Sequence, residues 1–450
     1  MRNRSSEPPY WASDIEAMVP TEAIRLEEAG LRRQLDYLGA HSPFYQRKLR
    51  EAGIGFDEIR TRADLERVPL TDKSELRASQ ERHPPYGDHV TADPDAIIRV
   101  HGSSGTTGRP SWVGLTRRDS DGWAEMVARS MYATGVRRSS VTAYAFSIGF
   151  FCGGPANIDA IQAIGSTLVP VGTGASDRLV SAIQDLHVDH LLCTPSYAQY
   201  LAEYVRTKVG LDPRTLGVRR LSVGGEPGGG VPAVRAKIEL DWNARVFDAM
   251  GSADLAPVFL SECDEQAGMH FHGQGYLLPE LIDPDSWASI PIEEGVEGEL
   301  VVSHLDRECV PLLRFRTRDR VIVWTRPCPC GRTSFRLRCV GRTDDMLLVL
   351  GVNVFPSAVK DVITSHRPDT TGEMLIELDA PGPKVEPPLR VLVEHGPEVP
   401  AEALDELAGR LAADLRDKLV VRVDVRLVPP GSLPRSEMKA RLVTVVDTPR

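Results

Sequence analysis

The chain has 450 residues and a formal net charge of −10, from 63 acidic and 53 basic side chains. Its hydrophobic content of 42% is ordinary for a globular protein, and its length is enough for two to four domains. No run of lysines and arginines is long enough to indicate a nucleic-acid footprint, so we expect no nucleic-acid partner. No apolar run approaches the roughly 18 residues of a membrane span, and the N-terminus lacks a signal-like apolar core. We therefore expect a cytoplasmic protein that does not enter a membrane.

The first 95 residues or so have a mainly helical pattern. Leucines at helical spacing, Leu31, Leu35 and Leu38, continue a pattern that starts near residue 21. Further on, Thr71 precedes a second helical segment, and a threonine in that place can cap a helix. We therefore predict a helical N-terminal region.

A loop rich in glycine and hydroxyl groups follows an expected strand over residues 96–100. Residues 103–110 read Ser-Ser-Gly-Thr-Thr-Gly-Arg-Pro. The glycines let backbone N–H groups approach an anion, and the hydroxyls add donors, although such a composition is also common in plain surface loops. A Walker-type loop does not fit, because it needs a lysine after its last glycine. The residues predicted to hold phosphate are Ser103, Ser104, Gly105, Thr106, Thr107 and Gly108.

From residue 96 to about 325, short apolar strands alternate with segments of helical length. Four of these strands are expected at residues 141–146, 166–171, 190–194 and 220–225. This alternation is typical of βαβ units, so we predict an α/β fold with a mostly parallel sheet covered by helices. In such sheets ligands bind beyond the carboxyl ends of the strands, where residues 224–227 fall.

The pattern changes again near residue 340. Residues 341–345 are polar and typical of a turn, and strands are expected at 346–350 and 389–393. Residues 401–419 have leucines along one helical face. We therefore predict two domains, residues 1–340 and residues 341–450, the second being a small α+β domain behind a hinge.

Several short motifs occur in an order that resembles the phenylacetate-CoA ligase branch of the adenylate-forming enzymes. The resemblance implies two half-reactions. A carboxylate attacks the α-phosphate of Mg-ATP to give an acyl-adenylate and pyrophosphate; the C-terminal domain then rotates, and a thiol, usually that of CoA, displaces AMP. The motifs lie at residues 42–45, 70–73, 103–110, 224–227, 298–302, 311–319, 341–345, 351–356 and 431–436, nearly the whole chain.

The resemblance also implies roles for single residues. Asp319 would hold both ribose hydroxyls, a task that suits a two-oxygen acceptor. Lys439 would bridge the carboxylate and the α-phosphate, where a cation offsets developing charge. The other implied positions are Gly225, Glu226 and Pro227 at the adenine, Asp248 and Arg342 at the nucleotide, Asp254 on Mg²⁺, Asp344 at the hinge and Gly351 on the thiol side.

The chain departs from the family pattern at three places. Met250 stands where relatives have tyrosine, Asp254 where they have glutamate, and Met438 where they usually have glycine. Aspartate is one methylene shorter but still a Mg²⁺ ligand, whereas methionine cannot donate a hydrogen bond. We interpret the changes at Met250 and Asp254 as retained adenylation with a rebuilt acyl pocket, whereas Met438 bears on how its loop reaches the site.

The implied acyl pocket combines aromatic and small residues. Such a lining leaves a slot for a planar ring, which favours an aryl or arylacetic acid, although ordinary core packing of the aromatics is the alternative. The expected lining residues are Tyr144, Ser147, Phe150, Phe151, Gly153, Met250 and Gly251.

The seven cysteines are an odd number in a large chain, which argues against a disulfide framework. Four residues form a candidate zinc site: Cys263, His270, Cys328 and Cys330. Three thiolates and one imidazole suit a closed, tetrahedral structural site, and relatives with a similar Cys-Pro-Cys-Gly turn also suggest zinc. His272 could replace His270, and buried free thiols are the alternative.

The predicted function is therefore an ATP-dependent aryl-CoA ligase that uses ATP, Mg²⁺ and CoA, with structural Zn²⁺, on a phenylacetate- or benzoate-like acid. One alternative is a biosynthetic enzyme that loads an amino- or hydroxybenzoate, such as a hydroxyanthranilate, onto a carrier-protein thiol or another acceptor. Another is a fold relative that binds a nucleotide or acyl group without catalysis. The sequence leaves open the acid, the acceptor thiol and the oligomeric state, for which a homodimer is one option.

Overall fold

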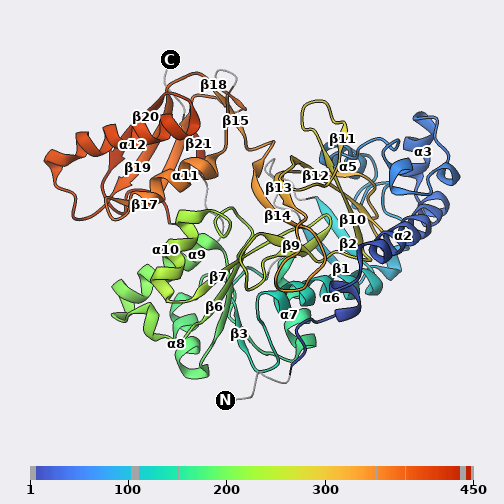
Figure 1. Ribbon diagram of the computed structural model, residues 1–450, viewed down its shortest axis with the longest axis horizontal. Helices are drawn as coiled ribbons and strands as arrows, with labels where there is room; N and C mark the ends of the chain where they lie inside the picture. Colours follow the sequence, from blue (N-terminus) through green and yellow to red (C-terminus); the bar gives the residue numbers. More distant parts are fainter. Residues whose placement is uncertain are drawn as a thin grey trace. The chain divides into compact units, whose positions relative to one another are not determined.

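The computed structural model describes residues 7–102, 111–148, 152–349, 352–380, 382–435 and 442–446. The chain divides into two compact units (Figure 1). The first unit contains Met1–Leu192 and Phe247–Arg338, and the second contains Cys193–Val246 and Cys339–Arg450. No helix in these described ranges is long and apolar enough to cross a membrane.

The first unit begins with helices, as the leucine spacing predicted. Leu31, Leu35 and Leu38 are all buried along one side of the long second helix. The prediction that Thr71 caps a helix was wrong, because the cap of the fifth helix is Asp72, whose carboxylate accepts from the Ser74 N–H. These helices are α1 (Ser13–Glu16), α2 (Pro20–His41), α3 (Pro43–Glu51), α4 (Arg62–Leu65) and α5 (Lys73–Arg82).

The predicted phosphate loop is flanked by a two-stranded antiparallel sheet. Strand β1 (Arg99–Gly102) pairs with β2 (Trp112–Leu115), with Gly102 opposite Trp112. The first strand starts later than predicted, because Pro94–Ala96 forms a 3-10 turn. The loop residues 103–108 themselves lie outside the described residues.

Parallel strands and crossover helices form the centre of the first unit, as predicted. Strand β3 pairs in parallel with both β4 and β5. The apolar residues of β5 are fully buried, as expected for a strand covered on both faces. The elements are α6 (Arg117–Ala133), β3 (Val141–Tyr144), α7 (Gly153–Ile164), β4 (Thr167–Pro170), α8 (Ser176–Leu186) and β5 (His190–Cys193).

The rest of this unit is an antiparallel region that the sequence pattern did not predict. Its strands follow the order β11-β10-β12-β13-β14-β9-β8-β7. The α/β class is nevertheless confirmed. The strands are β7 (Arg245–Ser252), β8 (Ala256–Ser261), β9 (Met269–Phe271), β10 (Leu277–Ile282), β11 (Ser289–Ile290), β12 (Glu297–His304), β13 (Phe315–Trp324) and β14 (Arg336–Arg342).

The second unit joins a short α/β segment to the C-terminal part of the chain. The segment contains α9 (Pro195–Tyr204), which continues as a π-helical turn over Val205–Val209, then β6 (Arg220–Gly224) and α10 (Pro232–Trp242). The Ala233 N–H, in the first turn of α10, donates to the carboxylate of Asp361 over 3.1 Å. Residues 193–246 therefore contact the C-terminal part directly.

The C-terminal part of this unit is α+β, as predicted. A four-stranded sheet of order β20-β19-β17-β21 and a three-stranded sheet of order β16-β15-β18 accompany two helices. Leu407, Leu411 and Leu415 are buried along the last helix and belong to one core with the sheet. The elements are β15 (Leu347–Val349), β16 (Val352–Val354), α11 (Pro356–Ser365), β17 (Thr370–Leu378), β18 (Lys384–Val385), β19 (Leu389–His395), α12 (Leu404–Leu419), β20 (Val423–Val428) and β21 (Val443–Val445).

Candidate active site

Asp319, predicted to hold the ribose, lies on β13 and is only 8% exposed. Its N–H donates to the Thr317 hydroxyl over 3.0 Å. The preceding residue, Arg318, has a φ of 65°, in the left-handed region, and forms an ion pair with Asp72. The N-terminal region therefore contacts the chain next to the predicted ribose ligand.

Asp254, predicted to bind Mg²⁺, is buried in the turn after β7 and forms an ion pair with the Nζ atom of Lys73. Lys73 and Asp72 are consecutive residues, so one short segment contacts both Asp254 and the residue beside Asp319. The segment 72–73 therefore lies against Asp254 and against the residue next to Asp319. Sequence reasoning recognised the motif at 70–73 but gave these two side chains no role.

The departure at Met250 lies in β7, where the strand has a bulge. Met250 is paired with Leu260, and the register shifts between Met250 and Ser252. Gly251 occupies the bulge, and a Cβ atom added there would lie 2.0 Å from the Pro257 carbonyl oxygen. Glycine is therefore required at this position. Asp248, earlier in the same strand, donates its N–H to Glu262 Oε2 over 2.9 Å.

Tyr144 and Ser147, two of the residues predicted to line the acyl pocket, lie at and just beyond the carboxyl end of β3. Tyr144 is fully buried there, and its hydroxyl donates to the Ser147 carbonyl over 3.4 Å. Burial raises the pKa of Tyr144, while a hydrogen bond from Asn157 acts in the opposite direction. Gly153 begins α7, whereas Phe150 and Phe151 lie outside the described residues.

Asn157, which sequence reasoning missed, lies in α7 beside Tyr144. It is 4% exposed, and among the described residues its Oδ1 atom has no hydrogen-bond partner. A buried carbonyl without a donor is costly, so such an atom is a natural acceptor for a ligand. No residue pattern in the sequence singled it out, because an asparagine in a helix has no distinguishing periodicity.

The segment predicted at the adenine, residues 224–227, follows β6 in the second unit. Gly225 has a φ of 84°, which favours glycine. The carboxylate of Glu226 accepts from the Ser196 N–H at the start of α9 over 2.8 Å. The side chain of Glu226 thus fixes the turn that Pro227 continues, and the backbone of the turn is what could face a flat ring.

The predicted hinge residue Asp344 forms an ion pair of 2.9 Å with Arg342. Lys439 and Gly351 lie outside the described residues. Directly before the segment that contains Lys439, Arg435 donates to the fully buried Glu394 over 2.7 and 2.9 Å. These charge-assisted hydrogen bonds hold the chain at Arg435, directly before the segment that contains Lys439.

The predicted zinc ligands converge in the first unit. The ligand atoms of Cys263, His270, Cys328 and Cys330 all lie within 4.8 Å of one another. The Cys263 and Cys328 sulfurs are 3.7 Å apart, and Cys330 Sγ is 3.4 Å from His270 Nε2. A tetrahedral ion with Zn–S bonds of about 2.3 Å would separate two sulfurs by about 3.8 Å, so the cluster fits zinc.

The alternative ligand His272 is not part of this cluster. Its Nε2 atom lies 3.0 Å from the Ser261 hydroxyl, and burial lowers its pKa well below the ordinary value. By contrast, hydrogen bonds from Cys263 and then from His270 lower the pKa of Cys330, which favours a thiolate.

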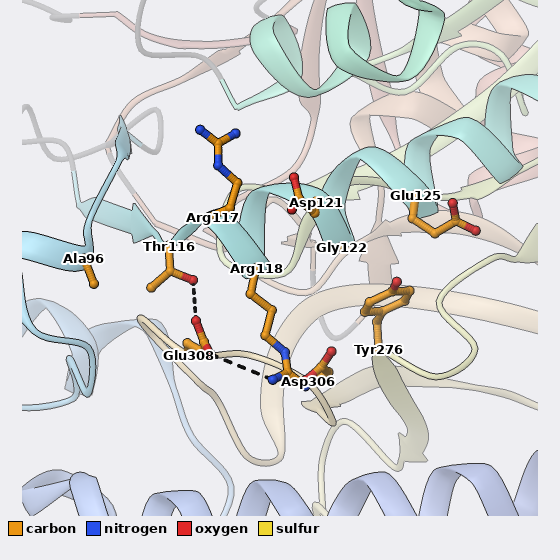
Figure 2. Close-up of a pocket in the computed structure, with 10 residues that line it drawn as sticks. All are labelled: Ala96, Thr116, Arg117, Arg118, Asp121, Gly122, Glu125, Tyr276, Asp306 and Glu308. Atoms are coloured by element: carbon orange, nitrogen blue, oxygen red, sulfur yellow. Dashed lines mark hydrogen bonds and ion pairs between the residues drawn. The ribbon is translucent and has the colours of Figure 1, made fainter. Parts of the chain in front are cut away.

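An open cleft of about 830 Å³ lies elsewhere in the first unit (Figure 2). Some of its lining residues contact one another: Arg118 pairs with Asp306 over 2.6 Å, and the Thr116 hydroxyl donates to Glu308 over 2.7 Å. None of the predicted site residues within the described ranges lines it. The cleft is therefore separate from the candidate active site.

Comparison with known proteins agrees with this geometry. The family model described as AMP-binding enzyme matches residues 18–305, and the model of the AMP-binding enzyme C-terminal domain matches residues 351–448. The chain belongs to the AMP-binding, adenylate-forming enzymes.

Within that family the chain falls in the phenylacetate-CoA ligase branch. It is 37% identical to the phenylacetate-coenzyme A ligase of Thermus thermophilus over 437 residues, covering 93% of this chain and 95% of that protein. It is 32% identical to the phenylacetate-coenzyme A ligase of Escherichia coli, covering 95% of each. A crystal structure of 2-hydroxyisobutyryl-CoA ligase in the postadenylation state has a TM-score of 0.91 and 31% identity, and covers 99% of this chain and 94% of that chain.

Proposed function

We propose that the protein activates an aromatic carboxylic acid with ATP and transfers the acyl group to CoA. The observation that carries this proposal is the pairing of the segment 72–73 with both Asp254 and Arg318, the neighbour of Asp319, in a chain of the phenylacetate-CoA ligase branch. AMP-forming acid–CoA ligation through an acyl-adenylate is the reaction of this class. The aromatic nature of the acid is supported by the names of the curated relatives.

The residues divide the first half-reaction between them. Asp319 would accept hydrogen bonds from the ribose hydroxyls, and Asp254 would hold Mg²⁺ at the phosphates. An oxygen of the acid then attacks the α-phosphorus, and pyrophosphate leaves. Lys439 would offset the charge that develops there. A domain rotation at Asp344 would then begin the second half-reaction, in which the CoA sulfur attacks the acyl carbon and AMP leaves.

The Cys263, His270, Cys328 and Cys330 cluster would hold a structural Zn²⁺. All four positions would be filled by protein ligands, which leaves none for a substrate. The ion would therefore fix the turn at residues 328–331 against β9 and take no part in the reaction.

Pyrophosphate release tests the proposed function. The purified protein is incubated with Mg-ATP and a panel of benzoic and arylacetic acids, with and without CoA. We expect acid-dependent pyrophosphate release and, with CoA, a thioester product; Lys439→Ala should lose both. If no aromatic acid stimulates release, or if the Lys439 variant keeps full activity, the assignment is wrong.

A second candidate is favoured by Asn157. Its buried Oδ1 atom, which has no partner among the described residues, lies beside Tyr144 and would accept a hydrogen bond from a hydroxyl or amino group on the ring. The acid would then be an amino- or hydroxybenzoate, and the acceptor a carrier-protein thiol or CoA. Asn157→Leu should reduce the kcat/KM ratio of hydroxybenzoate over benzoate by at least about tenfold, because the specific acceptor is lost. An unchanged ratio would contradict this candidate and leave the ligase reaction itself standing.

A further inference from the structure

Asp72 contacts Ser74, Glu75 and Arg318, and only the contacts with Ser74 and Glu75 belong to the cap of α5. Its Oδ1 atom accepts from the Ser74 N–H over 2.9 Å, and its own N–H donates to Glu75 over 3.0 Å, which completes a capping box for α5. Its Oδ2 atom forms the ion pair with Arg318. Asparagine caps helices as well as aspartate, so the cap does not require the negative charge.

The partner of this charge has a strained backbone. Arg318 has a φ of 65°, and a residue with a Cβ atom seldom adopts the left-handed conformation unless its surroundings hold it there. Arg318 and Asp319 share a peptide unit, so the conformation at 318 sets the direction in which the Asp319 side chain leaves β13. An interaction that holds Arg318 therefore also aims Asp319.

The segment before Asp72 is fixed to the same strand. The Thr71 N–H donates to the Arg314 carbonyl over 2.9 Å, and the Arg316 N–H donates back to the Thr71 carbonyl over 2.9 Å. The Thr71 hydroxyl also donates to the Leu313 carbonyl over 2.7 Å. Asp72 thus stands at a fixed point beside β13 and does not have to be ordered when it contacts Arg318.

We propose that Asp72 is a positioning residue for the nucleotide site, where its carboxylate holds Arg318 in the left-handed conformation and thereby directs Asp319 toward the ribose. This proposal rests on the proposed function through the role of Asp319. The next residue, Lys73, contacts Asp254, so the start of α5 supports both the ribose side and the metal side of the site.

Binding of AMP to the full-length protein, measured by calorimetry, tests this role without requiring an acid. Asp72→Asn keeps the cap but loses the charge, and Arg318→Met loses the pair but keeps a Cβ atom. We expect each to weaken AMP binding about tenfold, and the double variant to be no weaker, because the two residues act as a pair. Arg318→Gly, which adopts the left-handed conformation freely, should weaken binding less than about threefold.

A matched control is available in the same chain. Asp212 also caps a short helix and pairs with an arginine, Arg214, over 2.6 Å, so Asp212→Asn should leave AMP affinity within about twofold of the wild type. The KM for ATP should rise in Asp72→Asn with kcat at saturating ATP nearly unchanged, a split that a loss of folded protein would not produce.

Three results would overturn the proposal: AMP affinity in Asp72→Asn within twofold of the wild type, equal losses in Arg318→Gly and Arg318→Met, or additive losses in the double variant. Wild-type protein that binds AMP but releases no pyrophosphate with any acid would contradict only the proposed function. Wild-type protein that binds no AMP would contradict both.

Discussion

The Nζ atom of Lys73 forms an ion pair with the carboxylate of Asp254, the residue proposed to bind Mg²⁺. Both side chains are largely buried, with exposed fractions of 20% and 11%. In the proposed site this cation would lie close to the phosphates of Mg-ATP, and it balances the negative charge of the carboxylate.

Replacing Lys73 should therefore impair the use of ATP. We expect Lys73→Met to lower kcat/KM for ATP at least about tenfold. A fixed positive charge at a phosphate site stabilises the bound phosphates by more than about 1 kcal/mol. Initial rates of pyrophosphate release at varied ATP measure this. Lys208→Met, at an exposed position, is the control. A value for Lys73→Met within twofold of the control would show that the ion pair has no part in nucleotide use.

Gly251 should tolerate no side chain. In Gly251→Ala the new Cβ atom would lie 2.0 Å from the Pro257 carbonyl oxygen, so the bulge next to Met250 and Asp254 has to move. We expect a loss of about 2 kcal/mol or more in the free energy of unfolding and a large loss of activity. Gly409→Ala, with open space around it inside α12, should instead be stabilising by up to about 1 kcal/mol. Denaturant unfolding of both variants compares them directly.

Metal analysis of the purified protein should find about one equivalent of zinc per chain. Cys330→Ser should lose the zinc and lower the midpoint of thermal unfolding by about 5 °C or more, since a structural ion contributes to folding. Cys339→Ser, outside the cluster, should keep the zinc. Less than half an equivalent in the wild type would favour the alternative of free thiols.

The free energy of unfolding should fall in mild acid because His89 is protonated more readily in the unfolded chain than in the folded one. Burial lowers the pKa of His89 to about 4, with Asp88 and Asp254 raising it and Lys73 lowering it. Between pH 6.5 and 4 the unfolded chain therefore binds more protons than the folded one, so the free energy of unfolding falls as the pH falls, by up to about 3 kcal/mol from this group. Above pH 6.5 the contribution of His89 is constant.

Denaturant unfolding at a series of pH values measures this dependence. His89→Asn should flatten it between pH 6.5 and 4, whereas the exposed His187→Asn, at a left-handed position that suits asparagine, should leave it unchanged. Equal slopes for His89→Asn and the wild type would contradict the assignment.

The Arg435–Glu394 pair should matter for adenylation although neither residue is proposed to touch the substrate. Glu394→Gln leaves a largely buried guanidinium with only the exposed carboxylate of Glu203, 3.8 Å away, as a counter-charge. We expect this to cost up to about 3 kcal/mol and to disturb the chain directly before residue 436. We expect slower acid-dependent pyrophosphate release in Glu394→Gln and in Arg435→Met, with non-additive effects in the double variant. Arg390→Met breaks the exposed pair with Asp379 and should change little. Rates equal to that control would contradict the role of the pair.

The periodicity of apolar residues predicted the helices and the parallel strands, because the pattern that identifies each of these elements lies within a short stretch of neighbouring residues. The leucines of α2 and α12 and the apolar run of β5 are examples. The antiparallel strands were missed because β12 and β13 are buried over most of their length and show no simple alternation at the start.

The site was predicted only as far as motifs identify it. The predicted convergence of Cys263, His270, Cys328 and Cys330 agrees with the structure. The common location of Asp254 and Asp319 stays a prediction, which the contacts of Lys73 with Asp254 and of Asp72 with Arg318 support. The partners Lys73 and Arg318 could not be predicted, since their contacts join residues 181 and 246 positions apart in the chain. A capping position was also assigned one residue too early, to Thr71, because threonine and aspartate are both good caps.

The contact between the Ala233 N–H and the Asp361 carboxylate bears on where this enzyme can be truncated. A fragment that stops at residue 340 would retain α9 and α10 but lack the strands and helices with which residues 193–246 form a compact unit. Apolar side chains such as Val234, now buried, would lose their cover. Expression of the isolated large domain should therefore yield aggregating protein unless solubilising substitutions are made on α10, and work on the separate half-reactions is better done by point variants of the whole chain.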